Sequence, residues 1–227
     1  ILRAAPKAVL WLLSGGDAAD QNLREHAMAQ NIEPDRLVFA PRKHNAEHLA
    51  RYPLADLFLD TAPYGAHTTA SDAMWMGVPV ITTPGRSFAS RVCASLVRAA
   101  GLPELACSTH QEYVQRAIAL ANDPVGTKMF KERLAAGRGA CTLFDTLGLV
   151  RSLEGLYAQM WAEFEEGRLP RPDLANLELY HDIACRFSHA DEQEPFERKY
   201  LAALAYQHAV SPVRPDSRLW TETATPT

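Results

Sequence analysis

The amino-acid sequence predicts an α/β fold, a doubly wound parallel sheet followed by helices. Short apolar runs, typical of strands that are buried on both faces, recur over residues 8–82. A segment of helical pattern follows each run, which is the order of β-α-β units in a parallel sheet. From residue 111 onward, only helical patterns remain.

Four strands are expected in this sheet. The first run, AVLWLL, is apolar at every position, and Gly15, Gly16 and Asp17 then predict a turn with a helix cap. The second run is RLVFA, the third is ADLFLD, which leads into a turn with proline and glycine, and the fourth is VPVIT. The predicted strands are residues 8–13, 36–40, 55–60 and 78–82.

The expected helices have ordinary start and stop residues. The helix after the third strand ends at Gly77, since glycine readily adopts the left-handed conformation that stops a helix. Apolar residues at intervals of three and four from Val150 to Phe164 predict a longer amphipathic helix. The predicted helices are residues 18–31, 46–52, 68–76, 88–100, 111–122, 124–136, 150–164 and 195–208.

Glycine and proline after the amphipathic helix predict a domain boundary near residue 170. We expect residues 1–170 to form the lobe that carries the sheet. Residues 171–227 are expected to form a helical C-terminal extension with a disordered end. The sequence starts at Ile1 rather than methionine, and its first six residues look like the end of a helix, so we expect a fragment of a longer protein.

Composition and charge argue against several classes of partner. The content of 47% hydrophobic and 22% charged residues is that of a soluble globular protein. The net charge of -4, without a run of lysine and arginine, argues against a nucleic-acid partner. No apolar run approaches the roughly 20 residues that cross a bilayer, and the start is a poor signal peptide, so no membrane partner is expected. The four cysteines form no C-x-x-C pair, which favours reduced thiols in a cytoplasmic protein over a disulfide framework or a zinc site.

Loops that follow the strands are the candidate binding site, because ligands of doubly wound sheets lie beyond the carboxyl ends of the strands. The most informative loop leads from Asp60 into the helix that starts near His67, Thr68 and Thr69. A helix N-terminus with threonine hydroxyls suits a diphosphate, and Asp72, one turn further on, could accept hydrogen bonds from ribose hydroxyls. From physics alone, an ordinary helix capped by one of the threonines explains these residues equally well.

A second loop segment, APRKHNAEHLAR, lies on the same rim of the sheet. His48 could lie against a base or ribose, Arg51 could bond to a base edge, and backbone groups near Lys43 could contact the rest of the base. Taken alone, this segment favours the alternative of a polar surface turn with a solvated histidine.

A third loop leads to Arg91, which could lie near phosphates, although an ordinary surface arginine after a helix capped by Ser87 is the favoured alternative. His44 and His48 are four residues apart but lack a third ligand, so no metal site is expected. The sequence contains no spaced carboxylate pair, Walker A motif or G-x-G-x-x-G motif.

The string ADLFLDTAPYGAHTTASDAMWMGVPVITTPGRSFASRVCAS resembles the donor-site core of the protein O-linked N-acetylglucosaminyltransferase family. LWLL, RLVFAP and LEGLYAQMWAEFEEG resemble segments of that family in the same order. The resemblance covers residues 1–170, and its specific part is H-T-T-x-x-D with D-T upstream and G-x-P and P-G downstream. The chain therefore resembles a bacterial-type homologue.

The resemblance implies the second lobe of a two-lobed glycosyltransferase of the GT-B type. It implies UDP-N-acetylglucosamine as the donor, protein Ser or Thr hydroxyls as acceptors, and an inverting reaction without a metal ion or another cofactor. His67, Thr68 and Thr69 would face the diphosphate and Asp72 would hold the ribose. The remaining implied contacts are with the uridine: His48 would stack beside it, and Arg51 and the backbone at Lys43 would lie beside the uracil.

The resemblance also implies that part of the site lies elsewhere. The family's phosphate-binding lysine, the first lobe around the acceptor, the catalytic residues and the tetratricopeptide-type helical repeats would precede Ile1. The family often has lysine where Asn45 stands. Two alternatives stay open: a protein N-glucosyltransferase or other UDP-sugar transferase, and a non-catalytic nucleotide-binding module.

Overall fold

The computed structural model describes residues 1–168, 174–187, 196–214 and 216. The chain divides into two compact units, Ile1–Leu149 and Val150–Thr227. The boundary near residue 170 stays a prediction, and most of the tail that we expect to be disordered lies outside the described residues.

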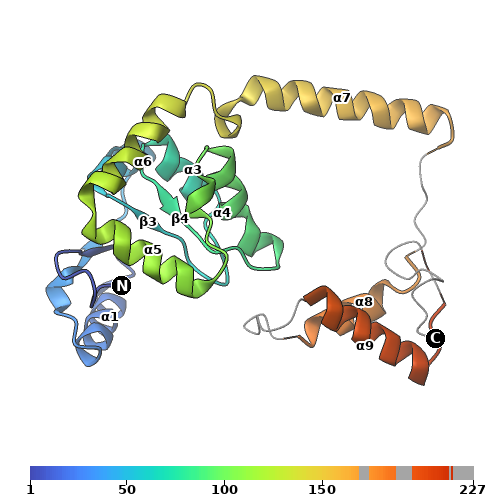
Figure 1. Ribbon diagram of the computed structural model, residues 1–227, viewed down its shortest axis with the longest axis horizontal. Helices are drawn as coiled ribbons and strands as arrows, with labels where there is room; N and C mark the ends of the chain where they lie inside the picture. Colours follow the sequence, from blue (N-terminus) through green and yellow to red (C-terminus); the bar gives the residue numbers. More distant parts are fainter. Residues whose placement is uncertain (169–173, 188–195, 215, 217–227) are drawn as a thin grey trace. The chain divides into compact units, whose positions relative to one another are not determined.

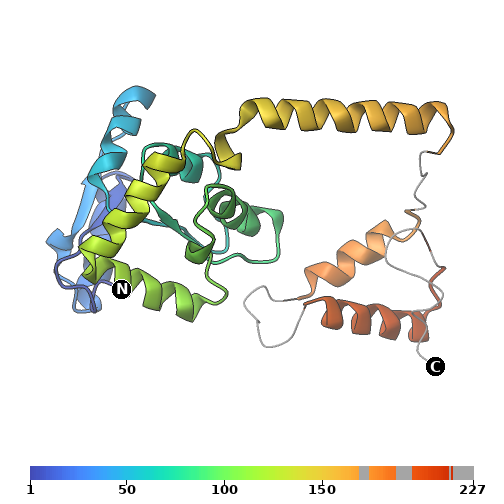
Figure 2. The same ribbon diagram turned by 45° about the horizontal axis from the view of Figure 1, so that its top comes forward.

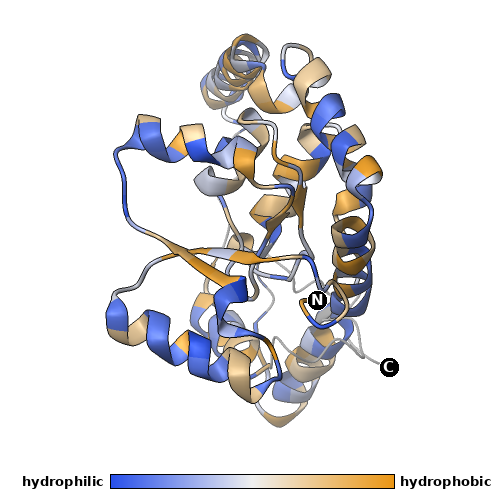
Figure 3. Cartoon of the chain, turned by 90° about the vertical axis from the view of Figure 1, so that its left-hand side faces the viewer, coloured by the Kyte–Doolittle hydropathy of each residue, from blue (hydrophilic) through white to orange (hydrophobic). Residues whose placement is uncertain are grey.

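The first unit begins with two parallel strands joined by a helix (Figure 1). Strand β1 (Leu10–Leu13) pairs with β2 (Leu37–Ala40) through helix α1 (Asp17–Ala29). The N-cap of α1 is Gly16, at a φ of 99° within the predicted turn, and no side chain caps the helix. The strands are among the most hydrophobic segments of the chain, which explains why both could be recognised from their apolar runs (Figure 3).

The second pair of strands carries the main core. Strand β3 (Phe58–Leu59) lies parallel to β4 (Val80–Ile81), and a bridge from Thr82 to Ala106 extends the pairing beyond β4. Both strands are shorter than the predicted 55–60 and 78–82, partly because Ala55 instead closes a tight turn by bonding to the Tyr52 carbonyl. The apolar runs are present, but only their central residues form the ladder.

Helices cover both faces of this second pair, as in a doubly wound sheet. Alternate residues point to opposite faces, so Phe58 and Val80 pack with helix α3 (Thr68–Trp75) and helix α4 (Phe88–Ala99). The intervening Ile81 packs instead with helix α5 (His110–Asn122), whose position beside the strands is visible in Figure 2. Helix α2 (Asn45–Arg51) connects β2 to β3.

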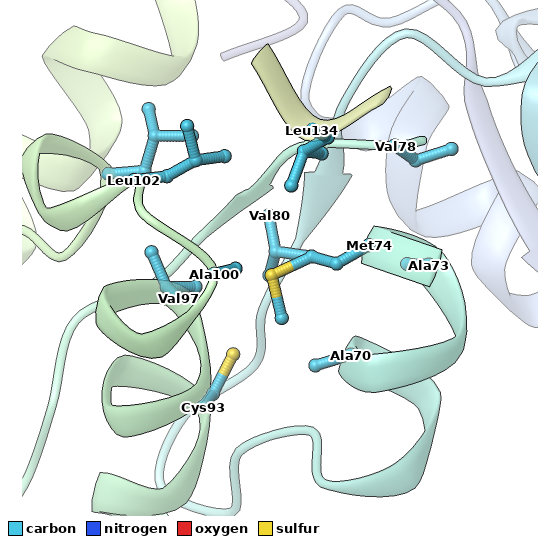
Figure 4. Packing of buried hydrophobic residues seen from close by; sticks show 11 residues of the cluster. Ala70, Ala73, Met74, Val78, Val80, Cys93, Val97, Ala100, Leu102 and Leu134 are labelled. Atoms are coloured by element: carbon cyan, nitrogen blue, oxygen red, sulfur yellow. The ribbon is translucent and has the colours of Figure 1, made fainter. Parts of the chain in front are cut away.

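The largest core cluster lies between α3, α4 and β4. Met74, Val80 and Val97 are fully buried, and Figure 4 shows their side chains gathered at the centre of this cluster. Leu134 of helix α6 (Pro124–Gly137) closes the cluster. This packing fixes α3 and α4 relative to each other and to the end of β4, where the candidate site lies.

The end of α3 confirms the predicted glycine stop. Gly77 has a φ of 82°, its N–H bonds to the Met74 carbonyl, and the next N–H, that of Val78, bonds back to Ala73. This is the left-handed helix ending that glycine allows without steric cost.

The remaining helices were largely predicted. Helix α7 (Thr146–Glu165) contains the expected amphipathic segment, and its apolar residues are exposed. Helix α9 (Phe196–Val210) matches the prediction for 195–208. Helix α8 (Leu177–Cys185) was missed; it packs on α9 through Tyr180, Ile183, Tyr200 and Leu204. A helix of nine residues offers only two apolar turns, too few for a clear periodic signal.

Candidate functional site

The segment that we call the entry loop, residues 60–67, connects β3 to α3. Asp60 directly follows β3 and is 8% exposed. Its Oδ1 accepts hydrogen bonds from the backbone N–H of Thr61 at 2.9 Å and of Ala66 at 2.6 Å, and its Oδ2 accepts one from the Thr82 hydroxyl at 2.6 Å. The entry loop is thus folded around one buried carboxylate.

The first turn of α3 has free backbone donors. His67 is the N-cap, and no side chain caps the helix, so the predicted alternative of a threonine cap is wrong. Within the described part of the chain, the N–H groups of Thr68 and Thr69 have no acceptor, and both residues are exposed. Two unpartnered N–H groups at the positive end of a helix dipole form a suitable place for an anion.

The imidazole of His67 joins the entry loop to the start of α4. Its Nε2 lies 3.2 Å from the carbonyl oxygen of Ala89, which also accepts a bond from the Gly65 N–H at 3.1 Å. The ring stacks on Tyr64 at 5.3 Å between centroids and meets the edge of Phe88 at 5.8 Å. Because a carbonyl can only accept, the proton of the neutral imidazole lies on Nε2. Nδ1 is then the nitrogen without a proton and can accept a hydrogen bond.

The start of α4 forms the other side of this region. The Ser87 hydroxyl accepts the Ser90 N–H, which confirms the predicted cap. The N–H of Gly85 bonds to the Ser90 carbonyl, so the loop before α4 folds back on its first turn. Arg91 follows on α4 with an exposed side chain. The structure therefore places Arg91 on the helix that also contacts His67.

A second cluster forms around the end of α2. Arg51 donates from Nη1 to the Pro41 carbonyl at 3.1 Å, and its Nη2 lies 3.3 Å from His48 Nδ1. Since a guanidinium only donates, His48 Nδ1 is the acceptor and its Nε2 carries the proton. The His48 ring also meets Tyr52 edge-on at 5.1 Å. Arg51 therefore orients His48 and the loop that precedes α2.

Asp72 of α3 connects electrostatically to this cluster. Burial raises the pKa of the Tyr52 hydroxyl, and the negative charge of Asp72 raises it further. The Tyr52 ring thus contacts His48, and the charge of Asp72 acts on its hydroxyl. Sequence analysis did not select Tyr52, although its position four residues after His48 on a helical segment is a signal that could have found it.

The Lys43 side chain forms an exposed ion pair with Glu47 at 3.2 Å. Together with Arg42 and His44 these residues line an open depression of about 310 Å³ beside α2. Such an exposed pair contributes little to stability. The predicted role of Lys43 lies in its backbone, and the residue as a whole is exposed beside this depression.

The described residues contain no group of three or more His, Cys, Asp or Glu side chains that could hold a metal ion. The same region contains no helix of the length and apolar character needed to span a bilayer. The start of α3 combines free N–H donors and His67 with the partly buried carboxylate of Asp72 on the same helix, a set that fits an anion linked to a hydroxyl-bearing ring.

The model of glycosyl transferase family 41 matches residues 1–153. The chain belongs to glycosyl transferase family 41. The match includes every candidate site residue named above, from Lys43 to Arg91. The expected fold, one lobe of a GT-B type glycosyltransferase, is confirmed by a solved family structure. The chain is similar to a mutant of the Thermobaculum terrenum O-GlcNAc transferase, with a TM-score of 0.66 and 32% identity, over 70% of this chain and 31% of that one.

Curated relatives support the same family. The chain is 37% identical over 167 residues to a UDP-N-acetylglucosamine–peptide N-acetylglucosaminyltransferase of Caenorhabditis elegans, covering 74% of this chain and 14% of the relative. It is 38% identical over 186 residues to a probable enzyme of the same name from Arabidopsis thaliana, covering 80% of this chain and 19% of the relative. The family 41 chain described here thus spans less than a fifth of the length of these two relatives.

Proposed function

We propose that this chain is the donor-binding lobe of a glycosyltransferase that transfers N-acetylglucosamine from its UDP conjugate to Ser or Thr hydroxyls of proteins. The observation that carries the proposal is the pair of free N–H groups at Thr68 and Thr69, beside His67. The names of both relatives, which specify UDP-N-acetylglucosamine and a peptide, support the donor sugar and the peptide acceptor.

In this proposal, the two site clusters bind different parts of the donor. The first turn of α3 and His67 bind the diphosphate, with Arg91 near the phosphates. Asp72 accepts hydrogen bonds from the ribose hydroxyls. His48 lies against the uridine, and Arg51 and the backbone at Lys43 lie beside the uracil.

The proposed chemistry is electrostatic stabilisation of the leaving group. As the bond to the sugar breaks, negative charge grows on the β-phosphate of UDP. Fixed N–H donors at a helix N-terminus stabilise that charge more strongly in the transition state than in the bound substrate. We propose an inverting reaction without a metal ion or another cofactor. The catalytic residues, the acceptor-side lobe and helical repeats belong to the remainder of the protein in this proposal.

We also propose which partners the protein binds and where in the cell it is located. Apart from the donor and a protein acceptor, we propose no nucleic-acid or membrane partner, in line with the net charge of -4. All four cysteines lie in the described part of the chain and are free, which supports a cytoplasmic location.

Calorimetric titration of UDP into the intact protein, with and without EDTA, tests the donor site and its independence from metal. We expect binding with the same dissociation constant in both buffers. Binding that EDTA abolishes and Mn²⁺ restores would contradict the metal-free site. An absence of UDP binding would favour a non-catalytic module that keeps only the fold.

Turnover distinguishes the sugar and acceptor. We expect hydrolysis and peptide transfer with UDP-N-acetylglucosamine in preference to UDP-glucose. The reverse preference, with transfer to Asn, would favour a protein N-glucosyltransferase. Bound UDP without turnover of either donor would favour the binding module.

A further inference from the structure

Asp60 is a buried carboxylate that faces the entry loop. Its two oxygens take three donors: two backbone N–H groups of the loop and the hydroxyl of Thr82, which is fully buried next to the end of β4. The backbone of Asp60 is held as well, since its N–H bonds to the Ile81 carbonyl and its carbonyl accepts the Tyr113 hydroxyl at 2.8 Å. One residue thus connects β3, β4, α5 and the entry loop.

The charge of Asp60 is balanced by these donors. None of the ion pairs between described residues includes Asp60. The charge of Asp60 affects two neighbouring groups. Burial raises the pKa of the Cys93 thiol and of the Tyr113 hydroxyl, and the negative charge of Asp60 raises both pKa values further. A buried carboxylate is stable only where hydrogen bonds replace its lost hydration.

The bond to Ala66 controls the start of α3. Ala66 directly precedes His67, the N-cap, and its 2.6 Å bond to Asp60 is short, as is typical when the acceptor is charged. The loop has little room to relax, because a Cβ atom added at Gly65 would lie 3.2 Å from both Asp60 Oδ2 and the Ala89 carbonyl. The direction in which Thr68 and Thr69 present their N–H groups therefore depends on the Asp60 carboxylate.

We infer that Asp60 is a positioning residue for the diphosphate of the donor: without touching the ligand, its carboxylate orients the first turn of α3 and His67. This inference rests on the proposed function. It predicts a selective effect, since the ribose and base residues, Asp72 and His48, receive no bond from Asp60.

The test compares UDP with uridine on the intact protein. In Asp60→Ala we expect the dissociation constant of UDP to rise about tenfold, as for the loss of one anchoring hydrogen-bond group, while that of uridine changes less than about twofold. Asp60→Asn keeps the side-chain volume but replaces one acceptor oxygen with a donor, so we expect an intermediate and equally selective loss. UDP binding is measured by calorimetry and uridine binding by ligand-observed NMR.

The matched control is Tyr113→Phe, which removes the bond to the Asp60 backbone but leaves the carboxylate contacts intact. We expect it to lower the unfolding temperature without changing the ratio of the two dissociation constants. Equal weakening of UDP and uridine in Asp60→Asn would overturn the inference and indicate a general structural role, and so would unchanged UDP binding. Wild-type protein that binds no UDP would instead contradict the proposed function.

Discussion

Arg51 Nη2 and His48 Nδ1 lie 3.3 Å apart, and this contact fixes both the orientation and the tautomer of the histidine. The same guanidinium holds the Pro41 carbonyl, so Arg51 organises the region where a base is proposed to lie. Because Arg51 bonds to both the loop and His48, it determines where these groups lie relative to a bound base, whether or not Arg51 itself contacts the base.

The first prediction concerns this pair. Arg51→Ala leaves His48 without its donor and frees the loop before α2. We expect UDP binding to weaken about tenfold, the change expected when a charged hydrogen-bond donor is lost, as measured by calorimetry. Arg98→Ala, an exposed arginine in the last turn of α4, is the control and should bind like wild type. Normal affinity in Arg51→Ala would argue against a base site beside α2.

Asp72 provides the second prediction, since its proposed partners are the ribose hydroxyls. Asp72→Ala should weaken UDP binding about tenfold or more, because two hydrogen bonds to a charged acceptor are lost. Binding of inorganic pyrophosphate, which has no ribose, should stay within about twofold of wild type if each contact acts alone. Calorimetry with the two ligands checks this difference. Wild-type UDP affinity in the variant would exclude the ribose assignment.

Much of the fold was predictable because its signals are local. The runs AVLWLL and RLVFA are apolar throughout, and β1 and β2 lie within them. The stop at Gly77 follows from its left-handed backbone. What could not be predicted depends on packing: β3 and β4 are only two residues long because neighbouring segments take their outer hydrogen bonds.

The candidate site shows the same division. One segment of the sequence was enough to select the residues around the start of α3, since their spacing places them at a helix start. These residues are His67, Thr68, Thr69 and Asp72. The roles of Tyr52 and Asp60 were not predictable, because they depend on interactions between distant parts of the chain: the charge of Asp72 acts on the Tyr52 hydroxyl, and the Thr82 hydroxyl donates to Asp60. The identity of the cap also needed the structure, as side-chain bonding decides it.

The third prediction tests the core beneath the site. Met74 is fully buried between α3, α4 and β4, so Met74→Ala should lower the free energy of unfolding by about 2–5 kcal/mol through lost packing and a cavity. Met129 is 59% exposed, and Met129→Ala should cost less than about 0.5 kcal/mol. Urea unfolding of both variants measures the difference. Equal effects would contradict this core.

The fourth prediction concerns the α8–α9 helix pair at high pH. Burial raises the pKa of the Tyr180 hydroxyl from 10.0 to about 12, and its bond to Asp216 at 2.6 Å acts in the same direction. As the pH rises, Tyr180 loses its hydroxyl proton in the unfolded chain before it does so in the folded chain. The contribution of the Tyr180 hydroxyl to stability is therefore complete below pH 10 and is lost as the pH rises to about 12.

The unfolding temperature of the second unit should therefore fall as the pH rises from 9 to 12, and it should fall less in Tyr180→Phe than in wild type. Tyr206, which is 72% exposed, provides the control variant Tyr206→Phe, which should retain the fall. An identical pH profile in Tyr180→Phe and wild type would show that the bond to Asp216 has no such effect.

The last prediction uses the close contact at Gly65. A methyl group there would lie 3.2 Å from the Ala89 carbonyl, a backbone atom that also bonds to the Gly65 N–H and to His67. Because this carbonyl is fixed by α4, the entry loop must shift instead, and His67 shifts with it. We expect Gly65→Ala to weaken UDP binding severalfold while uridine binding is retained, measured by calorimetry and ligand-observed NMR. Gly139→Ala, where an added Cβ meets no atom within 4 Å, is the matched control. If both variants bind UDP equally well, the contact between the entry loop and α4 does not govern the diphosphate site, and the geometry of His67 must be set by the Asp60 carboxylate alone.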